Sequence, residues 1–124
     1  MSKRNDSIRW LLENFNYIDS VTMVDDKGRV VVKQRFNPRY TDKENEIHNK
    51  WCIGKNLLEV FPSLNHKDSS LLQALTKGKI VHYESQRVIN YEGKLSVTNN
   101  ITFPVIIRGK IVGAVELSRD ITNF

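Results

Sequence analysis

The last third of this 124-residue chain contains three long runs rich in valine, isoleucine and threonine, separated by two short glycine turns. The runs are 80–91, 94–107 and 110–121, and the turns are Glu92-Gly93 and Arg108-Gly109. Runs of this composition are typical of β-strands, and glycine turns this short join strands into hairpins. Strands joined in this way are antiparallel. The sequence therefore predicts an antiparallel meander of three strands at the C-terminal end.

Residues 20–25 and 29–36 show a second β-strand pattern earlier in the chain. The turn between them ends at Gly28, and glycine readily adopts the positive φ of a tight reversal, so a hairpin is predicted here. A helix is predicted before it, over residues 6–18. Its apolar stripe at helical spacing consists of Ile8, Leu11, Leu12, Phe15 and Ile18. The chain thus opens with a helix and two strands.

The middle of the chain predicts short helices. Proline breaks the strand at Asn37-Pro38, because it has no amide hydrogen for the ladder. Acidic residues then come early and basic residues late in 42–50, an order that complements a helix dipole. A single apolar turn, 57–61, and a third helix ending at Lys77 follow. The predicted order is helix, two strands, helical insert and three strands in one α+β unit.

Four short segments lie within or beside these elements: Ile53-Gly54-Lys55-Asn56, Val60-Phe61-Pro62, Gly113-Ala114-Val115-Glu116 and Asp120-Ile121-Thr122. In sequence and order they resemble the PAS family over nearly the whole chain, from about Ile8 to Thr122. The resemblance implies a five-stranded antiparallel sheet with the helical insert on one face. We therefore expect an N-terminal amphipathic helix in 1–18 and a PAS sensor domain in 19–122.

The combination of 61–64, 71–73 and 113–116 is similar to the N-terminal sensor of bacterial sigma-54-dependent activators of the arginine-utilisation type. In such proteins an ATPase domain and a DNA-binding helix-turn-helix follow the sensor. Neither fits into this chain, so we expect a fragment that begins at the native start. The single cysteine and the lack of a long apolar run agree with a cytoplasmic setting and with no membrane span.

Enzymatic chemistry is not predicted. The three histidines have no metal-ligand spacing, and no glycine-rich phosphate loop is present. Cys52 lies four residues after His48, but a buried structural cysteine explains it better than a nucleophile. Flavin-binding relatives carry an Asn-Cys-Arg-Phe motif, from which Cys52 departs, and no cofactor is predicted. A haem-binding sensor stays open as an alternative, because His66 precedes the helix that carries the axial histidine in such relatives.

The net charge of +5 raises the question of nucleic-acid binding. The basic residues are scattered, and their densest run is Lys77-Gly78-Lys79. A DNA-reading module concentrates its charge on one helix or face. We therefore expect no specific nucleic-acid binding by this domain.

The long strand 94–107 carries the main hint of a ligand site. Its odd-numbered apolar residues, which we assign to the core face, are Leu95, Val97, Ile101, Phe103, Val105 and Ile107. Asn99 interrupts this row, whereas Ser96, Thr98, Asn100 and Thr102 fall on the other face. A buried asparagine needs partners. A helix backbone group or water, a polar ligand, or a bulge that swaps the faces would each account for it.

An amino-acid ligand also needs a cation for its carboxylate, and Arg35 and Arg87 lie on predicted strands. Tyr40, Trp51 and Tyr83 are candidates for the apolar walls. A surface position is the simpler explanation for the two arginines. A place in the core is the simpler explanation for the three aromatic residues. The leading hypothesis is a sensor of a small polar metabolite such as an amino acid; the alternative is a ligand-free dimerisation and relay module.

Two further roles are predicted at the chain ends. A homodimer is expected through the N-terminal helix, with the contact residues Ile8, Trp10, Leu11, Leu12 and Phe15. Asp120 and Thr122 end the last strand at the exit to any downstream domain. Side-chain to backbone bonds there can fix the exit angle, so we assign these two residues to signal coupling.

Overall fold

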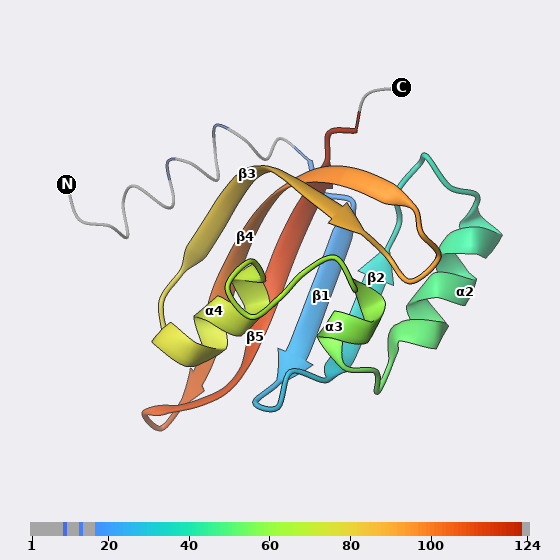
Figure 1. The fold of residues 1–124 in the computed structure, drawn as a ribbon. Coiled ribbons are helices and arrows are strands. Elements are labelled where there is room, and N and C mark those ends of the chain that lie inside the picture. Colours follow the sequence, from blue (N-terminus) through green and yellow to red (C-terminus); the bar gives the residue numbers. More distant parts are fainter. Residues whose placement is uncertain (1–8, 10–12, 14–16, 123–124) are drawn as a thin grey trace.

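A five-stranded antiparallel sheet with three helices on one face makes up the computed structural model, which describes residues 9, 13 and 17–122 (Figure 1). In chain order the elements are β1 (Ser20–Asp25), β2 (Val30–Arg35), α2 (Asp42–Cys52), α3 (Leu57–Val60), α4 (Ser70–Lys77), β3 (Val81–Ile89), β4 (Leu95–Ile107) and β5 (Lys110–Asp120). The predicted α+β order is confirmed, with strand ends shifted by at most two residues.

The strand order in the sheet is β2-β1-β5-β4-β3, and every neighbouring pair is antiparallel. The meander β3-β4-β5 is the predicted one. It joins the first hairpin because β5 pairs with β1, with Ser118 opposite Ser20. The end of the last strand therefore lies beside the start of the first, at the point where the chain enters and leaves the sheet.

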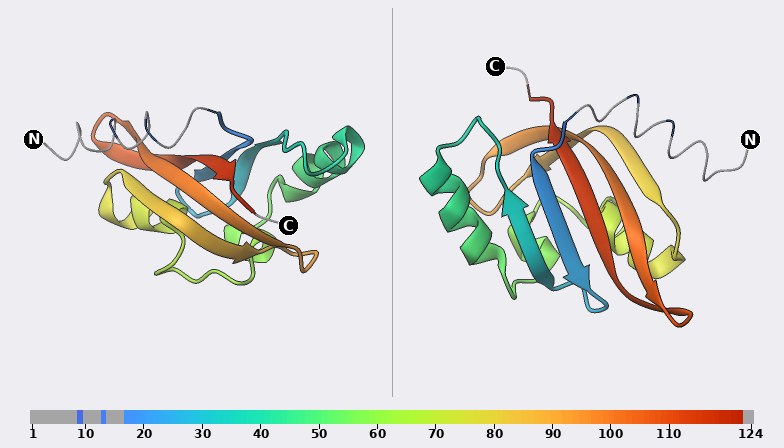
Figure 2. Two further views of the ribbon diagram at one scale, coloured as in Figure 1. Left: turned by 90° about the horizontal axis from the view of Figure 1, so that it is seen from above. Right: turned by 180° about the vertical axis from the view of Figure 1, so that it is seen from behind.

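All three described helices cover the same face of the sheet; viewed from behind, the strands lie in front of them (Figure 2). The apolar core fills the space between these layers, where small and branched side chains from both layers interlock. Its buried members are Val24, Val30, Cys52, Leu57, Val60, Leu71, Leu72, Ala74 and Ala114. Among the described residues, no helix is long and apolar enough to cross a bilayer.

Local sequence explains the helix ends. In α2 the Thr41 hydroxyl accepts a hydrogen bond from the Glu44 amide, and the Glu44 carboxylate accepts one from the Thr41 amide, a reciprocal capping box. Ser69 caps α4, and Gly78 ends it with φ 64°. These two caps fix where the insert turns back over the sheet.

The predicted N-terminal helix is described only at Arg9 and Glu13, which are helical and exposed. Residues 17–19 are not helical, so the helix ends before Tyr17 and Ile18 does not belong to it. The proposed dimer residues Ile8, Trp10, Leu11, Leu12 and Phe15 lie outside the described residues. The dimer and the 1–18 boundary stay predictions.

Candidate functional site

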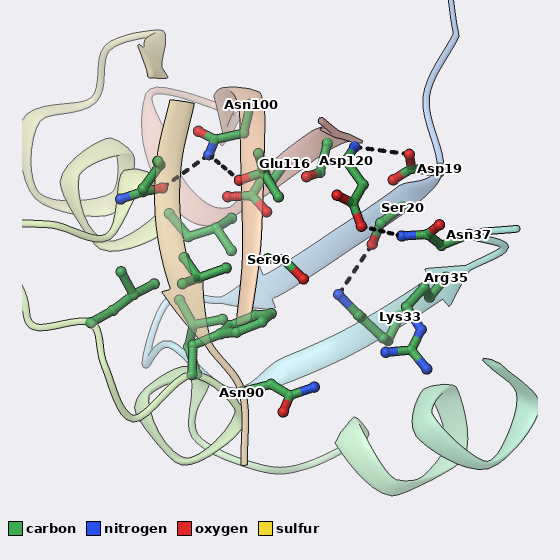
Figure 3. A pocket seen from close by; sticks show the side chains of 18 of the residues that line it. Asp19, Ser20, Lys33, Arg35, Asn37, Asn90, Ser96, Asn100, Glu116 and Asp120 are labelled. Atoms are coloured by element: carbon green, nitrogen blue, oxygen red, sulfur yellow. Dashed lines mark hydrogen bonds between the residues drawn. The ribbon is translucent and has the colours of Figure 1, made fainter. Parts of the chain in front are cut away.

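A cavity of about 70 Å³ lies between the sheet and the helical insert (Figure 3). Its walls come from all five strands, from α2, α3 and α4, and from the loops around α3. One probe-sized space of roughly 10–15 Å³ holds a water, so there is room for about five to seven water-sized groups. The cavity is partly open to solvent, so a small metabolite can occupy it and extend beyond it.

Lys33 is a buried cation in the wall of this pocket, on the β2 side. The pairing of β1 with β2 skips one residue, since Met23 pairs with Val32 and Val24 with Val30. This bulge leaves Val31 without a partner and turns both Val30 and Lys33 toward the helices. Without it, strict alternation from Val30 would place Lys33 on the opposite face.

Lys33 is buried and has no directly paired carboxylate, although Glu116 and Asp19 lie near enough to act on its charge. The residue is only 5% exposed, and its Nζ donates to the hydroxyl oxygens of Thr22 at 2.8 Å and Ser20 at 3.1 Å. No described carboxylate lies within ion-pair distance of it. Burial lowers the pKa of Lys33, because the charged form loses its hydration. The hydrogen bonds of the ammonium go to two hydroxyl groups and its other contact is the Phe61 ring, so no carboxylate is paired with it and it can attract an anion.

Arg35 lies two residues further along β2 and also lines the pocket. Its Nε donates to Asn45 Oδ1 at 2.6 Å, and its guanidinium carbon lies 3.9 Å from the centre of the Tyr40 ring. These contacts fix the plane of the guanidinium group. Its two terminal nitrogens donate to no other described residue, so the side of the fork that binds carboxylates is available.

Another part of the pocket wall is formed by Gln86, Asn100 and Glu116. Asn100 is 2% exposed and donates through Nδ2 to Gln86 Oε1 at 3.0 Å, whereas its Oδ1 has no partner among the described residues. Glu116 lies beside it in Figure 3. The Ser70 hydroxyl donates to Glu116 Oε2 at 2.8 Å and accepts from Thr102 at 2.8 Å. Burial raises the pKa of Glu116, which favours its neutral form.

Asp120 joins the pocket to the end of β5. Its Oδ2 accepts from Asn37 at 2.6 Å and from Arg39 Nε at 2.7 Å, with Arg39 also paired as a salt bridge at 2.6 Å. Its Oδ1 accepts from the amide of Thr122 at 2.8 Å and from the Thr122 hydroxyl. Burial opposes the charge, but these hydrogen bonds together keep the pKa of Asp120 below 3.8. Asp19 accepts from the Asp120 amide at 2.8 Å.

The assignment of Asn99 to the pocket was wrong. Ser96, Thr98 and Asn100 line the cavity, and the next residue on that face, Thr102, contacts α4. The apolar row of β4 thus faces away from the helices. Asn99 Oδ1 instead accepts from the amide of Ser85 at 2.9 Å. It stabilises a bulge in β3, where Ser85 has φ 53°.

Of the other five predicted ligand residues, only Arg35 lines the pocket. Arg87 is exposed. Tyr40 reaches the site through its contact with Arg35. Trp51 packs against the core and stacks on Tyr91, with ring centres 3.6 Å apart. The half-buried Tyr83 lies opposite Asn100 in the pairing of β3 with β4 and does not line the cavity.

Cys52 and His48 form a buried pair in α2, and His48 also lines the cavity. Cys52 is fully buried, and its Sγ lies 3.6 Å from His48 Nε2. Burial raises the pKa of the thiol, and burial together with nearby cations lowers the pKa of His48 to about 3. The pair therefore holds a neutral thiol and a neutral imidazole, not an activated nucleophile. His66 is exposed and outside the cavity, so it is not placed to ligate a haem there.

Sequence reasoning missed Lys33, Asn100 and Glu116. A lysine directly after three valines, in a strand with one buried face, is the signal that could have drawn attention to Lys33. Asn100 was placed on the outward face together with its polar neighbours. Glu116 appeared only as part of a family motif, although a carboxylate in the middle of an apolar strand is itself unusual.

Comparison with known proteins identifies the fold. No family model matches the chain. The chain is 36% identical over 101 residues to the transcriptional activator RocR of Bacillus subtilis (strain 168). This match covers 82% of the chain and 21% of the relative, so the chain spans about a fifth of that protein's length. The predicted resemblance to a sigma-54-dependent activator of the arginine-utilisation type is confirmed.

Solved structures agree on the architecture. The PAS domain of a Colwellia psychrerythraea protein superimposes with a TM-score of 0.61 at 17% identity, covering 94% of this chain and 98% of that one. A sensory box sensor histidine kinase from Vibrio cholerae gives 0.56 at 20% identity, covering 97% and 91%. At these identities the likeness shows the fold alone, and the fold is PAS.

Proposed function

We propose that this PAS sensor domain, related to a transcriptional activator, binds a small polar metabolite with a carboxylate group, such as an amino acid, in the pocket between sheet and insert. The domain acts as a regulatory, non-enzymatic part of a cytoplasmic multidomain activator. Its relative is a transcriptional activator, which supports such a setting.

The observation that carries the proposal is Lys33. A charge buried among hydroxyl groups costs free energy unless a counter-charge arrives. A ligand carboxylate would supply that counter-charge, and Arg35 would add a bidentate partner from the same strand. An interior built only for packing would not retain an ammonium 5% exposed beside a cavity.

The network around Asp120 supports a route from ligand to output. Asp120, Asp19, Ser118 and Asn37 all line the pocket, and Asp120 also holds Thr122 at the end of β5. A ligand that moves any of these side chains would change how firmly the exit from the sheet is held. In the proposed full-length protein, the domain signals in this way to downstream ATPase and DNA-binding domains, as a homodimer.

A thermal-shift screen tests the proposal, using the twenty common amino acids with ornithine and citrulline. A ligand at 100 times its dissociation constant stabilises by about 2.7 kcal/mol, roughly a 10 °C rise in Tm for a domain of this size. Lys33→Met should abolish the rise, whereas Lys110→Met, an exposed strand lysine, should preserve it. A wild-type protein that none of these compounds stabilises would contradict amino-acid binding and favour the relay module.

A further inference from the structure

The turn between β4 and β5 belongs to an arm that projects from the sheet. β4 pairs with β3 only as far as Thr102, opposite Val81, and β5 pairs with β1 only as far as Gly113, opposite Asp25. Residues 106–112, which we call the arm, therefore have no partner in either neighbouring strand. Figure 1 shows the arm extending past the ends of β1 and β3, at the end of the sheet away from the end of β5.

The arm and the end of α4 concentrate the positive charge of the chain. Residues 69–83 and 95–115 hold four of the 19 basic side chains and none of the 14 acidic ones, so they carry four of the five net positive charges. The fold brings the two segments together, because a Cβ at Gly78, just after α4, would lie 3.0 Å from Ile111 Cδ1 on the arm. All four cations are exposed: Lys77, Lys79, Arg108 and Lys110.

Two exposed isoleucines accompany these cations on the arm. Ile106 is 52% exposed and Ile107 is 57% exposed. Neighbouring residues of a strand point to opposite sides, so each side of the arm presents one isoleucine. Pro104 lies just before the arm, where β4 has no β3 partner, and a proline on a free edge hinders the addition of another strand. A partner would therefore be bound through side chains.

The two cations at the end of α4 and the four exposed side chains of the arm form one surface, the arm surface: Lys77, Lys79, Ile106, Ile107, Arg108 and Lys110. We propose that the arm surface docks a protein segment that combines acidic and aliphatic side chains. Carboxylates complement the cations, and aliphatic side chains cover the isoleucines. No residue of the arm surface lines the pocket, so the proposal does not depend on a ligand there.

A protein segment fits the arm surface better than a bilayer or a nucleic acid. Arg108 lies at the tip of the arm, ahead of both isoleucines, so insertion into a bilayer would carry a charge into the hydrocarbon before them. A nucleic acid would use the cations but leave the isoleucines in water, because unpaired bases stack on aromatic side chains. An acidic and aliphatic segment uses both kinds of side chain.

Fluorescence anisotropy with three labelled peptides of equal length tests the proposal. The first peptide alternates glutamate with leucine, the second glutamate with serine, and the third lysine with leucine. The wild-type protein should bind the glutamate–leucine peptide with a micromolar Kd, at least about tenfold more tightly than either of the others, because each of the others lacks one of the two complementary features.

Matched variants locate the binding. Lys79→Glu/Lys110→Glu should weaken binding of the glutamate–leucine peptide at least about tenfold, and Ile107→Ser at least about threefold. Lys43→Glu/Lys67→Glu makes the same change in net charge at exposed positions elsewhere and should weaken it less than about twofold. All five positions are exposed, so the melting temperature followed by circular dichroism should stay close to that of the wild type.

Four results would overturn the proposal. The wild-type protein fails to bind the glutamate–leucine peptide, or the two double variants lose the same affinity, which would show attraction to net charge alone. Ile107→Ser keeps full affinity. Phosphatidylserine vesicles or duplex DNA bind more tightly than the peptide at the same salt concentration, which would assign the cations to phosphate groups.

Discussion

Replacing Asp120 by alanine should destabilise the domain by about 3 kcal/mol. The carboxylate accepts hydrogen bonds from Asn37, from Arg39 and from both the amide and the hydroxyl of Thr122, and its side chain is only 5% exposed. Losing one hydrogen bond or cap costs about 1 kcal/mol, which is all that the sequence supports. Breaking a fully buried ion pair costs about 3–5 kcal/mol. The Arg39 side chain is 23% exposed and regains some water, which places the expected cost between these limits.

Urea unfolding followed by circular dichroism measures this cost. With a slope of about 1.5 kcal/mol per molar urea, the midpoint should fall by roughly 2 M. The native pKa of Asp120 is lowered, so this contribution is present above the unfolded value near 3.8 and is lost as the pH falls through the native value. Asp26→Ala, an exposed turn residue, is the matched control. An Asp120→Ala midpoint equal to that of Asp26→Ala would refute the proposed network.

Three further substitutions test separate parts of the fold. Gly113→Ala should cost more than about 2 kcal/mol in urea unfolding, because a Cβ there would lie 2.4 Å from the Val24 carbonyl oxygen. An unchanged midpoint would contradict this close approach. Thr41→Ala should cost about 1 kcal/mol by removing the α2 capping box, and an unchanged midpoint would show that the cap is dispensable. The pKa of His48 is lowered from 6.5 to about 3 in the folded domain. Below pH 6.5 the unfolded chain therefore binds a proton that the folded domain does not, and the free energy of unfolding should fall by up to about 1.4 kcal/mol per pH unit. His48→Phe should remove that part of the slope, and identical pH profiles for the two proteins would disprove the buried neutral imidazole.

The fold could be predicted because its signals are local. Two short glycine turns force the last three strands into a meander, and Gly28, with φ 78°, closes the first hairpin as expected. The pairing of β1 with β5 was expected only from the family resemblance, since no local signal specifies which strand of the first hairpin pairs with the meander. Pairing over such a separation depends on the whole chain.

The site was predicted less well because single bulges decide which way side chains point. Alternation along β2 assigns Lys33 to the outer face, but the skipped residue Val31 reverses it. On β4, the rule that the apolar row faces the core failed because the helix-facing side is polar at Asn100 and Thr102. Both faces of β4 are buried at this point, since Ile101 on the other face is also fully buried, so hydrophobicity alone does not identify the side that faces the helices.

Chemical-shift mapping of the ligand-bound domain tests the central claim most directly. The isotope-labelled protein is titrated with the amino acid that gives the largest thermal shift, and backbone and side-chain nitrogen signals are followed. A ligand in this pocket should cause the largest changes at Lys33, Arg35 and the side-chain amide of Asn100, with little change at exposed Arg87. Changes confined to the outer surface, with Lys33 and Asn100 unmoved at saturation, would contradict a ligand in this pocket.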